Sequence, residues 1–166
     1  ASLGIGSGDA VGIVTPNGPE AATVFLSIAS FATAAPLNPL YTKDEFKFYL
    51  EDLNAKILIV TEDGNTNAIA AASELGIKVL AVRLKKLPGD FSLTLDGEKL
   101  KQSPAKKNLC NDISLVLHTS GTTSRPKIVP LTSDNISVSA RNIARTLKLT
   151  NQDLYLNIMP LFHIHG

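Results

Sequence analysis

A loop rich in hydroxyl side chains separates two short apolar runs in the second half of the sequence. It contains Thr119, Ser120, Gly121, Thr122, Thr123, Ser124 and Lys127. Backbone amides and hydroxyl groups donate hydrogen bonds to phosphate oxygens, a lysine adds positive charge, and glycine lets a ligand approach the backbone closely. The composition therefore indicates a phosphate-binding loop, although an ordinary polar turn has a similar composition. The P-loop pattern does not apply, because Pro126 precedes Lys127 and Ile128 follows it.

The order of these residues is more specific than their composition. The run from Thr119 to Lys127 resembles the AMP-binding signature of the adenylate-forming superfamily, which includes acyl-CoA synthetases, 4-coumarate–CoA ligases, luciferases and peptide-synthetase adenylation domains. This sequence has Ser124 and Ile128 where the family usually has glycine. The version with Ser124, Arg125, Pro126 and Lys127 is most similar to the branch of oxalate–CoA ligase-like acyl-activating enzymes. The resemblance implies that Thr119, Ser120, Gly121, Thr122, Thr123, Ser124 and Lys127 bind the nucleotide.

A second candidate site lies at the end of the sequence, where Pro160, Leu161, Phe162 and His163 precede His165. A histidine beside an apolar segment is often structural, and no third metal ligand is placed near His163 and His165, so no metal site is predicted. The segment nevertheless resembles the proline-aromatic-histidine signature of the same superfamily. The resemblance implies that Phe162 and His163 border the substrate and that His163, with Lys127, belongs to the catalytic residues.

The family resemblance implies a reaction in two steps. A carboxylate attacks the α-phosphate of ATP and releases pyrophosphate, and a thiol, usually that of coenzyme A, then attacks the acyl adenylate. Residues 119–127 would stabilise the charge that develops on the pyrophosphate, and Mg²⁺ would share this role. The expected partners are therefore a carboxylic acid, oxalate or another small or medium acid, together with ATP and coenzyme A.

Three alternatives remain open. The first is a nucleotide- or phosphate-binding module without ligase chemistry, and the second is an adenylation domain that serves another thiol acceptor. The third is an ATP-dependent kinase. The family's ribose-binding aspartate and its small C-terminal domain with a catalytic lysine have no counterpart in these residues. We therefore expect residues 1–166 to form part of an N-terminal AMP-binding domain that is inactive on its own.

The bulk composition excludes several other classes. The chain has 166 residues and a net charge of +1, so it has no strong attraction to nucleic acid or acidic membranes. No apolar run reaches the ~18 residues of a membrane-spanning helix, and the start lacks the pattern of a signal peptide. With one cysteine, Cys110, an intramolecular disulfide is impossible. We expect an intracellular protein, cytoplasmic or peroxisomal. The sequence determines neither the acid nor the oligomeric state.

The elements that must position these residues alternate along the chain. Short apolar runs predict strands over 10–15, 34–37, 56–60, 78–82 and 112–118. A helix is expected over 19–32, and the capping-box spacing of Thr42 and Glu45 predicts the start of the next. A third helix is expected over 65–75, ended by Gly76 in a left-handed conformation. This alternation predicts an α/β fold with a doubly wound, mostly parallel sheet and flanking helices.

The remaining segments are less regular. Scattered lysines between residues 83 and 108 predict a surface excursion with one short helical turn. Residues 129–131 extend a strand, and a helix is expected over 133–149. Its apolar positions are expected to face inward; they are Ile136, Ala140, Ile143 and Leu147. A last strand is expected over 153–159.

Overall fold

The computed structural model describes residues 2–101, 103–119 and 126–164, and the described residues form one eight-stranded sheet with four helices. The strands are β1 (Ala10–Val14), β2 (Thr33–Pro36), β3 (Ile57–Thr61), β4 (Lys78–Leu84), β5 (Phe91–Leu95), β6 (Glu98–Lys99), β7 (Ile113–Thr119) and β8 (Lys127–Thr132). The helices are α1 (Pro19–Ala29), α2 (Lys43–Asp52), α3 (Thr66–Glu74) and α4 (Ser133–Thr146).

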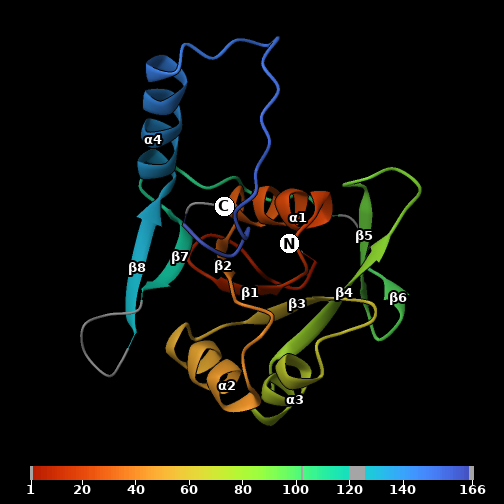
Figure 1. Cartoon of the computed structure of the whole chain (residues 1–166). Helices are drawn as coiled ribbons and strands as arrows, with labels where there is room; N and C mark the ends of the chain where they lie inside the picture. Colours follow the sequence, from red (N-terminus) through yellow and green to blue (C-terminus); the bar gives the residue numbers. More distant parts are fainter. Residues whose placement is uncertain (1, 102, 120–125, 165–166) are drawn as a thin grey trace.

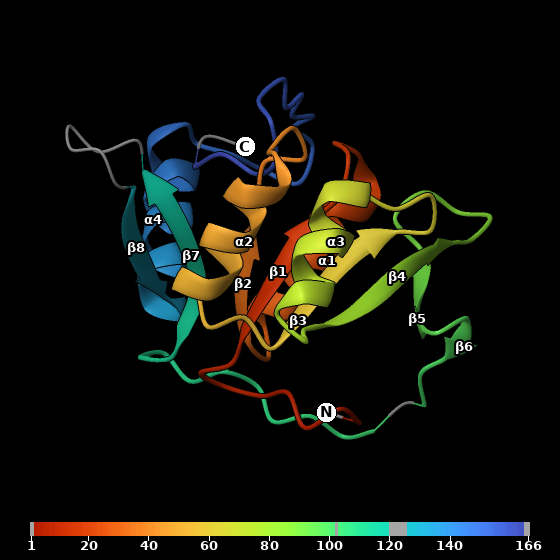
Figure 2. The same ribbon diagram turned by 90° about the horizontal axis from the view of Figure 1, so that it is seen from below.

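The strand order is β6-β5-β4-β3-β1-β2-β7-β8. The inner strands β4, β3, β1, β2 and β7 run parallel, whereas β5 and β6 at one edge and β8 at the other are antiparallel to their neighbours. Helix α1 covers one face of the sheet, and α2 and α3 cover the other (Figures 1 and 2). The predicted doubly wound, mostly parallel α/β fold is therefore confirmed.

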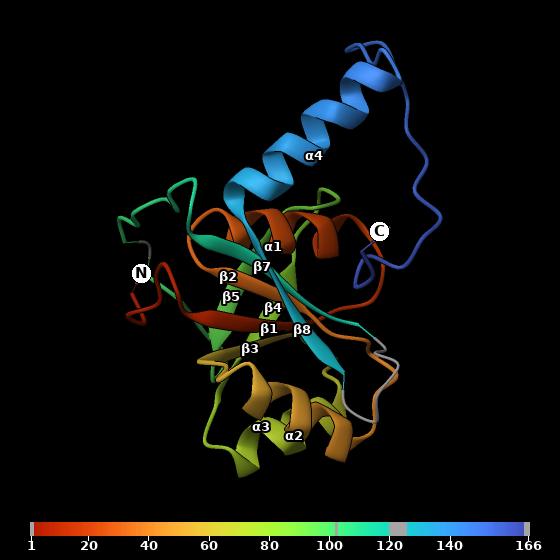
Figure 3. The same ribbon diagram turned by 90° about the vertical axis from the view of Figure 1, so that its left-hand side faces the viewer.

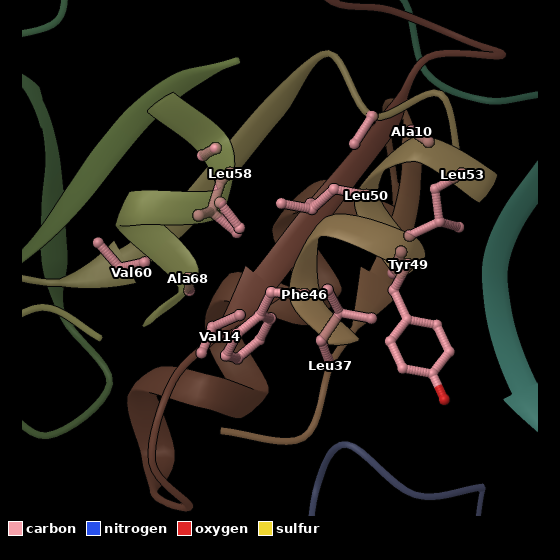
Figure 4. Packing of buried hydrophobic residues seen from close by; sticks show 14 of the residues in the cluster. Ala10, Val14, Leu37, Phe46, Tyr49, Leu50, Leu53, Leu58, Val60 and Ala68 are labelled. Carbon is pink, nitrogen blue, oxygen red and sulfur yellow. The ribbon is translucent and has the colours of Figure 1, made fainter. Parts of the chain in front are cut away.

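The central strands β1 and β3 are almost entirely apolar because helices bury both faces of the sheet there. Every residue of β1 is buried. On one face, Phe46 and Leu50 of α2 pack fully buried against Leu58 of β3 and the alanines of α3 (Figure 4). On the other face, Val24 of α1 belongs to a second cluster with residues of β1, β3 and β4. The core thus holds the inner strands, and their carboxyl ends, in fixed positions.

Local sequence signals explain where the first helices begin and end. Pro19 occupies the first position of α1, and Thr42 and Glu45 form the predicted capping box of α2. Gly76 follows α3 with a φ of 66°, as predicted for a left-handed residue after a helix. Helix α1 ends at Ala29 rather than at residue 32, because the chain already turns to enter β2 at Thr33.

The prediction of a short helical turn within residues 83–108 is wrong. This segment instead contains β5 and β6, which extend the sheet from β4. The two strands are joined by Asp96 and Gly97, with φ angles of 52° and 82°. An Asp-Gly pair with two positive φ angles is the preferred two-residue hairpin connection, and the lysines around it obscured this signal.

Two predictions near the end of the chain are also wrong. Residues 153–159 form no strand, and Leu154 and Leu156 are exposed. Helix α4 ends at Thr146 rather than at residue 149, and none of its residues is buried. Figure 3 shows α4 leading away from the sheet and the chain after it returning in an extended path. Ile136 near the start of α4 is half-buried beside Phe25 and Leu26 of α1, whereas Ile143 and residues 153–156 are exposed.

Candidate functional site

The hydroxyl loop connects β7 to β8 at the carboxyl edge of the parallel strands. Thr119 pairs with Lys127 at the end of this hairpin, and His118 pairs with Ile128 one step before. Ser120, Gly121, Thr122, Thr123 and Ser124 lie outside the described residues. Ligands of open α/β sheets bind beyond the carboxyl ends of the strands, so the two described ends of the loop lie where a ligand is expected.

Thr119 and Lys127 are both exposed. Within the described part of the chain, the Lys127 ammonium forms no ion pair. Its charge is therefore not neutralised by a described carboxylate. A hydroxyl and an ammonium group facing each other across a strand pair can together contact a multiply charged anion such as a phosphate group.

The segment with Phe162 and His163 is held at the same edge of the sheet by a residue that the sequence analysis did not select. Asn17, which follows β1, accepts a hydrogen bond through Oδ1 from the Leu161 backbone amide at 2.9 Å. The His163 amide donates to the Pro160 carbonyl at 3.0 Å and closes a turn. Because β1 and β7 run in the same direction in one sheet, this contact brings His163 to the carboxyl edge that also carries the loop.

His163 borders an apolar hollow of about 240 Å³ between α1 and β7. The wall from β7 consists of Leu115 and Leu117, and α1 contributes Phe25 among others. Phe162 is half-buried and is not among the described residues that line the hollow. An apolar hollow with one titratable side chain at its border is typical of a small-molecule site. A second hollow, of about 170 Å³, carries no titratable side chain in its described lining, and we assign it no role.

The opposite face of β7 carries a polar contact that the sequence analysis also missed. The side chain of His118 is 5% exposed, and its Nε2 lies 3.1 Å from Oδ2 of Asp52 at the end of α2. The ring of Tyr49 meets the imidazole edge-on, with 4.6 Å between ring centroids. Tyr49 in turn stacks on Tyr41, whose pKa is raised above its ordinary value first by burial and then by its hydrogen bond with Tyr49. Tyr41 is therefore neutral at physiological pH.

The described residues contain no group of three or more His, Cys, Asp or Glu side chains that could hold a metal ion. Thr119 and Lys127 suit phosphate oxygens rather than Mg²⁺, which prefers carboxylate and phosphate ligands. None of the helices in this part of the chain is long and apolar enough to cross a membrane.

Comparison with known proteins gives consistent matches over the whole chain. The family described as AMP-binding enzyme matches residues 1–166. An oxalate–CoA ligase from Arabidopsis thaliana is 44% identical, and a probable CoA ligase from Humulus lupulus is 43% identical; each match covers 98% of this chain and 32% of the relative. The crystal structure of ATP-bound MatB from Rhodopseudomonas palustris superimposes with a TM-score of 0.79 at 25% identity, over 99% of this chain and 33% of that chain. The chain thus spans about a third of the length of the curated relatives it matches.

Proposed function

Because the chain belongs to the AMP-binding enzyme family, we propose that the full-length protein is an ATP-dependent acid–CoA ligase. It activates a carboxylic acid as an acyl adenylate and transfers the acyl group to coenzyme A. Residues 1–166 form part of the larger, N-terminal domain of this enzyme. The observation that carries the proposal is the hairpin of β7 and β8, whose ends place Thr119 opposite Lys127 at the carboxyl edge of a parallel sheet. This edge is also where Asn17 holds the segment of His163.

In the first half-reaction, the acid's carboxylate oxygen attacks the α-phosphorus of ATP, and the bond to the bridging oxygen breaks as pyrophosphate leaves. Negative charge grows on the leaving group during this step. We assign Thr119, Ser120, Gly121, Thr122, Thr123 and Ser124 to hydrogen bonding of the phosphates. Lys127 supplies the charge that stabilises the departing pyrophosphate, because fixed donors and cations act most strongly where charge develops. Mg²⁺, brought in by the phosphates of ATP, would neutralise part of the same charge.

His163 and Phe162 are assigned to the acyl side of the site. The apolar hollow beside His163 would receive the carbon chain of the acid, while the imidazole borders the carboxylate. One of the two relatives is named as an oxalate–CoA ligase, and the other is named as a probable CoA ligase without an acid. The two names together do not single out one acid. The proposed substrate class is therefore a small or medium carboxylic acid. With its one cysteine, Cys110, exposed as a free thiol, we expect the protein in the cytoplasm or the peroxisome.

The test uses the purified full-length protein with ATP, Mg²⁺ and a panel of acids. The panel contrasts oxalate with a hydroxycinnamate and a medium-chain fatty acid, which an apolar hollow would accommodate. The expected result is carboxylate-dependent release of AMP and pyrophosphate, followed by an acyl-CoA detected by mass spectrometry when coenzyme A is added. Removal of Mg²⁺ by a chelator should stop pyrophosphate release.

The same assay separates the alternatives. A kinase would release ADP and phosphorylate the acid. A binding module would retain ATP and release no pyrophosphate with any acid. An adenylation domain serving another acceptor would form AMP and an adenylate but no acyl-CoA. Any of these three outcomes would replace the proposed function.

A further inference from the structure

Strand β7 presents different chemistry on its two faces immediately before the hydroxyl loop. Leu115 and Leu117 face the hollow beside His163. Val116 belongs to the cluster beneath α2 and α3, and His118 contacts α2. His118 is thus the last residue before the loop whose side chain is enclosed by the fold, since Thr119 is exposed.

A nearly enclosed imidazole requires a hydrogen-bond partner, because an unpaired buried polar group is costly. Asp52 supplies it: an ionised carboxylate only accepts hydrogen bonds, so the proton of this contact belongs to Nε2 of His118. The Tyr49 ring packs against the imidazole at an interplanar angle of 65°. This edge-to-face arrangement is favourable for aromatic rings and fixes the ring orientation.

Asp52 lies at a position where its carboxylate does not stabilise α2, the helix that carries it. Asp52 is the last residue of α2. A carboxylate there faces the negative end of the helix dipole, which is unfavourable. Glu51 is an exposed acid one residue earlier, and none of the hydrogen bonds or ion pairs between described side chains involves it. The contact with His118 therefore distinguishes Asp52 from its neighbour.

We propose that His118 is a positioning residue for adenylation, an inference that rests on the proposed function. Its contacts with Asp52 and Tyr49 hold the carboxyl end of β7 against α2. Since His118 pairs with Ile128 and Thr119 pairs with Lys127, holding this end of the hairpin fixes both ends of the phosphate-binding loop. Donors that act on a transition state must be held in place before the reaction, and a displacement of about 1 Å costs up to about 10²-fold in rate.

The experiment measures the two half-reactions separately in the full-length protein. Asp52→Ala removes the acceptor from a position whose side chain is 38% exposed, so the variant should fold. Its single-turnover rate of pyrophosphate release should fall by ~10-fold, well within the range for a misplaced donor. The attack of coenzyme A on a supplied acyl adenylate should be unchanged, because pyrophosphate has already left. Glu51→Ala, which removes the same charge from the same helix turn, should leave both rates unchanged.

Substitutions of His118 itself provide the second arm. His118→Leu keeps an apolar volume but loses the donor and should reduce pyrophosphate release at least as much as Asp52→Ala. His118→Gln retains a side-chain N–H that can reach Asp52 and should restore part of the rate. The melting temperatures of both variants show whether the comparison is between folded proteins.

Equal losses in Asp52→Ala and Glu51→Ala would overturn the proposal, as would equal losses in both half-reactions or a His118→Gln protein no better than His118→Leu. Failure of the proposed function is a different result. In that case the wild-type protein itself releases no carboxylate-dependent pyrophosphate, before any variant is compared.

Discussion

Replacing Lys127 with alanine in the full-length protein tests the role of the hydroxyl loop most directly. Lys127 is the first residue of β8, is exposed and has no ion pair within the described residues. An exposed side chain without a partner contributes little to stability, so its removal should change the free energy of unfolding by less than about 0.5 kcal/mol. A large loss of activity therefore cannot come from unfolding.

The kinetic effect should be much larger than the effect on stability. If Lys127 contacts the β- and γ-phosphates, its attraction strengthens as pyrophosphate acquires charge and departs. Interactions that strengthen toward the transition state raise the rate, whereas uniform binding lowers only the Michaelis constant. Loss of one preorganised donor costs about 10²–10³-fold in rate, or about 2.7–4 kcal/mol. Lys127→Ala should lower the adenylation rate by that amount while the Michaelis constant for ATP changes less.

The assay again separates the half-reactions, with Lys78→Ala as the matched control. Lys78 is likewise an exposed lysine at the first position of a strand, β4, and it lies on the other half of the sheet. Lys127→Ala should slow pyrophosphate release but leave the attack of coenzyme A on a supplied acyl adenylate nearly unchanged, and Lys78→Ala should affect neither. Equal losses in the two half-reactions, or no loss in either, would refute the role assigned to the loop.

Three further predictions concern the chain of residues 1–166 itself. It should release no pyrophosphate with ATP, Mg²⁺ and any acid of the panel, and sustained turnover would contradict the assignment to part of a domain. Phe46→Ala should lower the free energy of unfolding, measured with urea, by about 3–5 kcal/mol, because the Phe46 side chain of α2 is fully buried in the core. A loss below about 1 kcal/mol would argue against this core. The hydrogen bonds from Thr42, first from its backbone amide, lower the pKa of Glu45. The stabilisation by Glu45 is therefore present above its ordinary value of 4.5 and lost as the pH falls through the lower folded pKa. The difference in urea midpoint between wild type and Glu45→Ala should shrink from pH 7 to pH 3.

Much of the fold follows from signals that act over a few residues. The inner strands are short apolar runs, and the ends of α2 and α3 depend on Thr42, Glu45 and Gly76, whose effects are local. The edge hairpin was missed although Asp96 and Gly97 give a local signal. Apart from the buried Thr94, the residues of β5 and β6 are half-buried or exposed. These strands therefore lack the continuous apolar runs that identify buried strands, and the lysines around them indicated only a solvated surface.

The errors after residue 132 have a different cause. The apolar positions of α4, continued by Leu147 directly after it, are spaced as in a helix that packs on a partner, yet Ile143 and Leu147 are 54% and 64% exposed. A sequence pattern shows that a face is apolar but not which segment covers it. Beyond Ile136, the described residues provide little cover for α4 or for residues 153–159, and the matched relatives are about three times as long as this chain.

Some parts of the candidate site could be predicted from the sequence, and others could not. The order of residues in the loop, and the segment of His163, were identified from the sequence because each is continuous along the chain. Asn17 and Leu161 are separated by 144 residues, and Asp52 and His118 by 66. Polar residues of these types are common on protein surfaces, so nothing distinguishes them until the sheet brings them together. The roles of Lys127 and His163 in catalysis stay predictions.

Strand β7 connects all parts of this site, and its register determines their relation. Successive side chains of a strand point to opposite faces, so a slip of one residue would exchange the two sets. Leu117 would then face Asp52, and His118 would enter the apolar hollow beside His163. Both changes are unfavourable, one because a carboxylate loses its donor and the other because an imidazole enters an apolar wall. The contact between His118 and Asp52 thus helps to specify the register that puts Leu117 beside the hollow that His163 borders and Thr119 opposite Lys127. In the proposed function, one strand would then position both the acyl group and the phosphates, and a shift of β7 would disturb both substrates of the first half-reaction together.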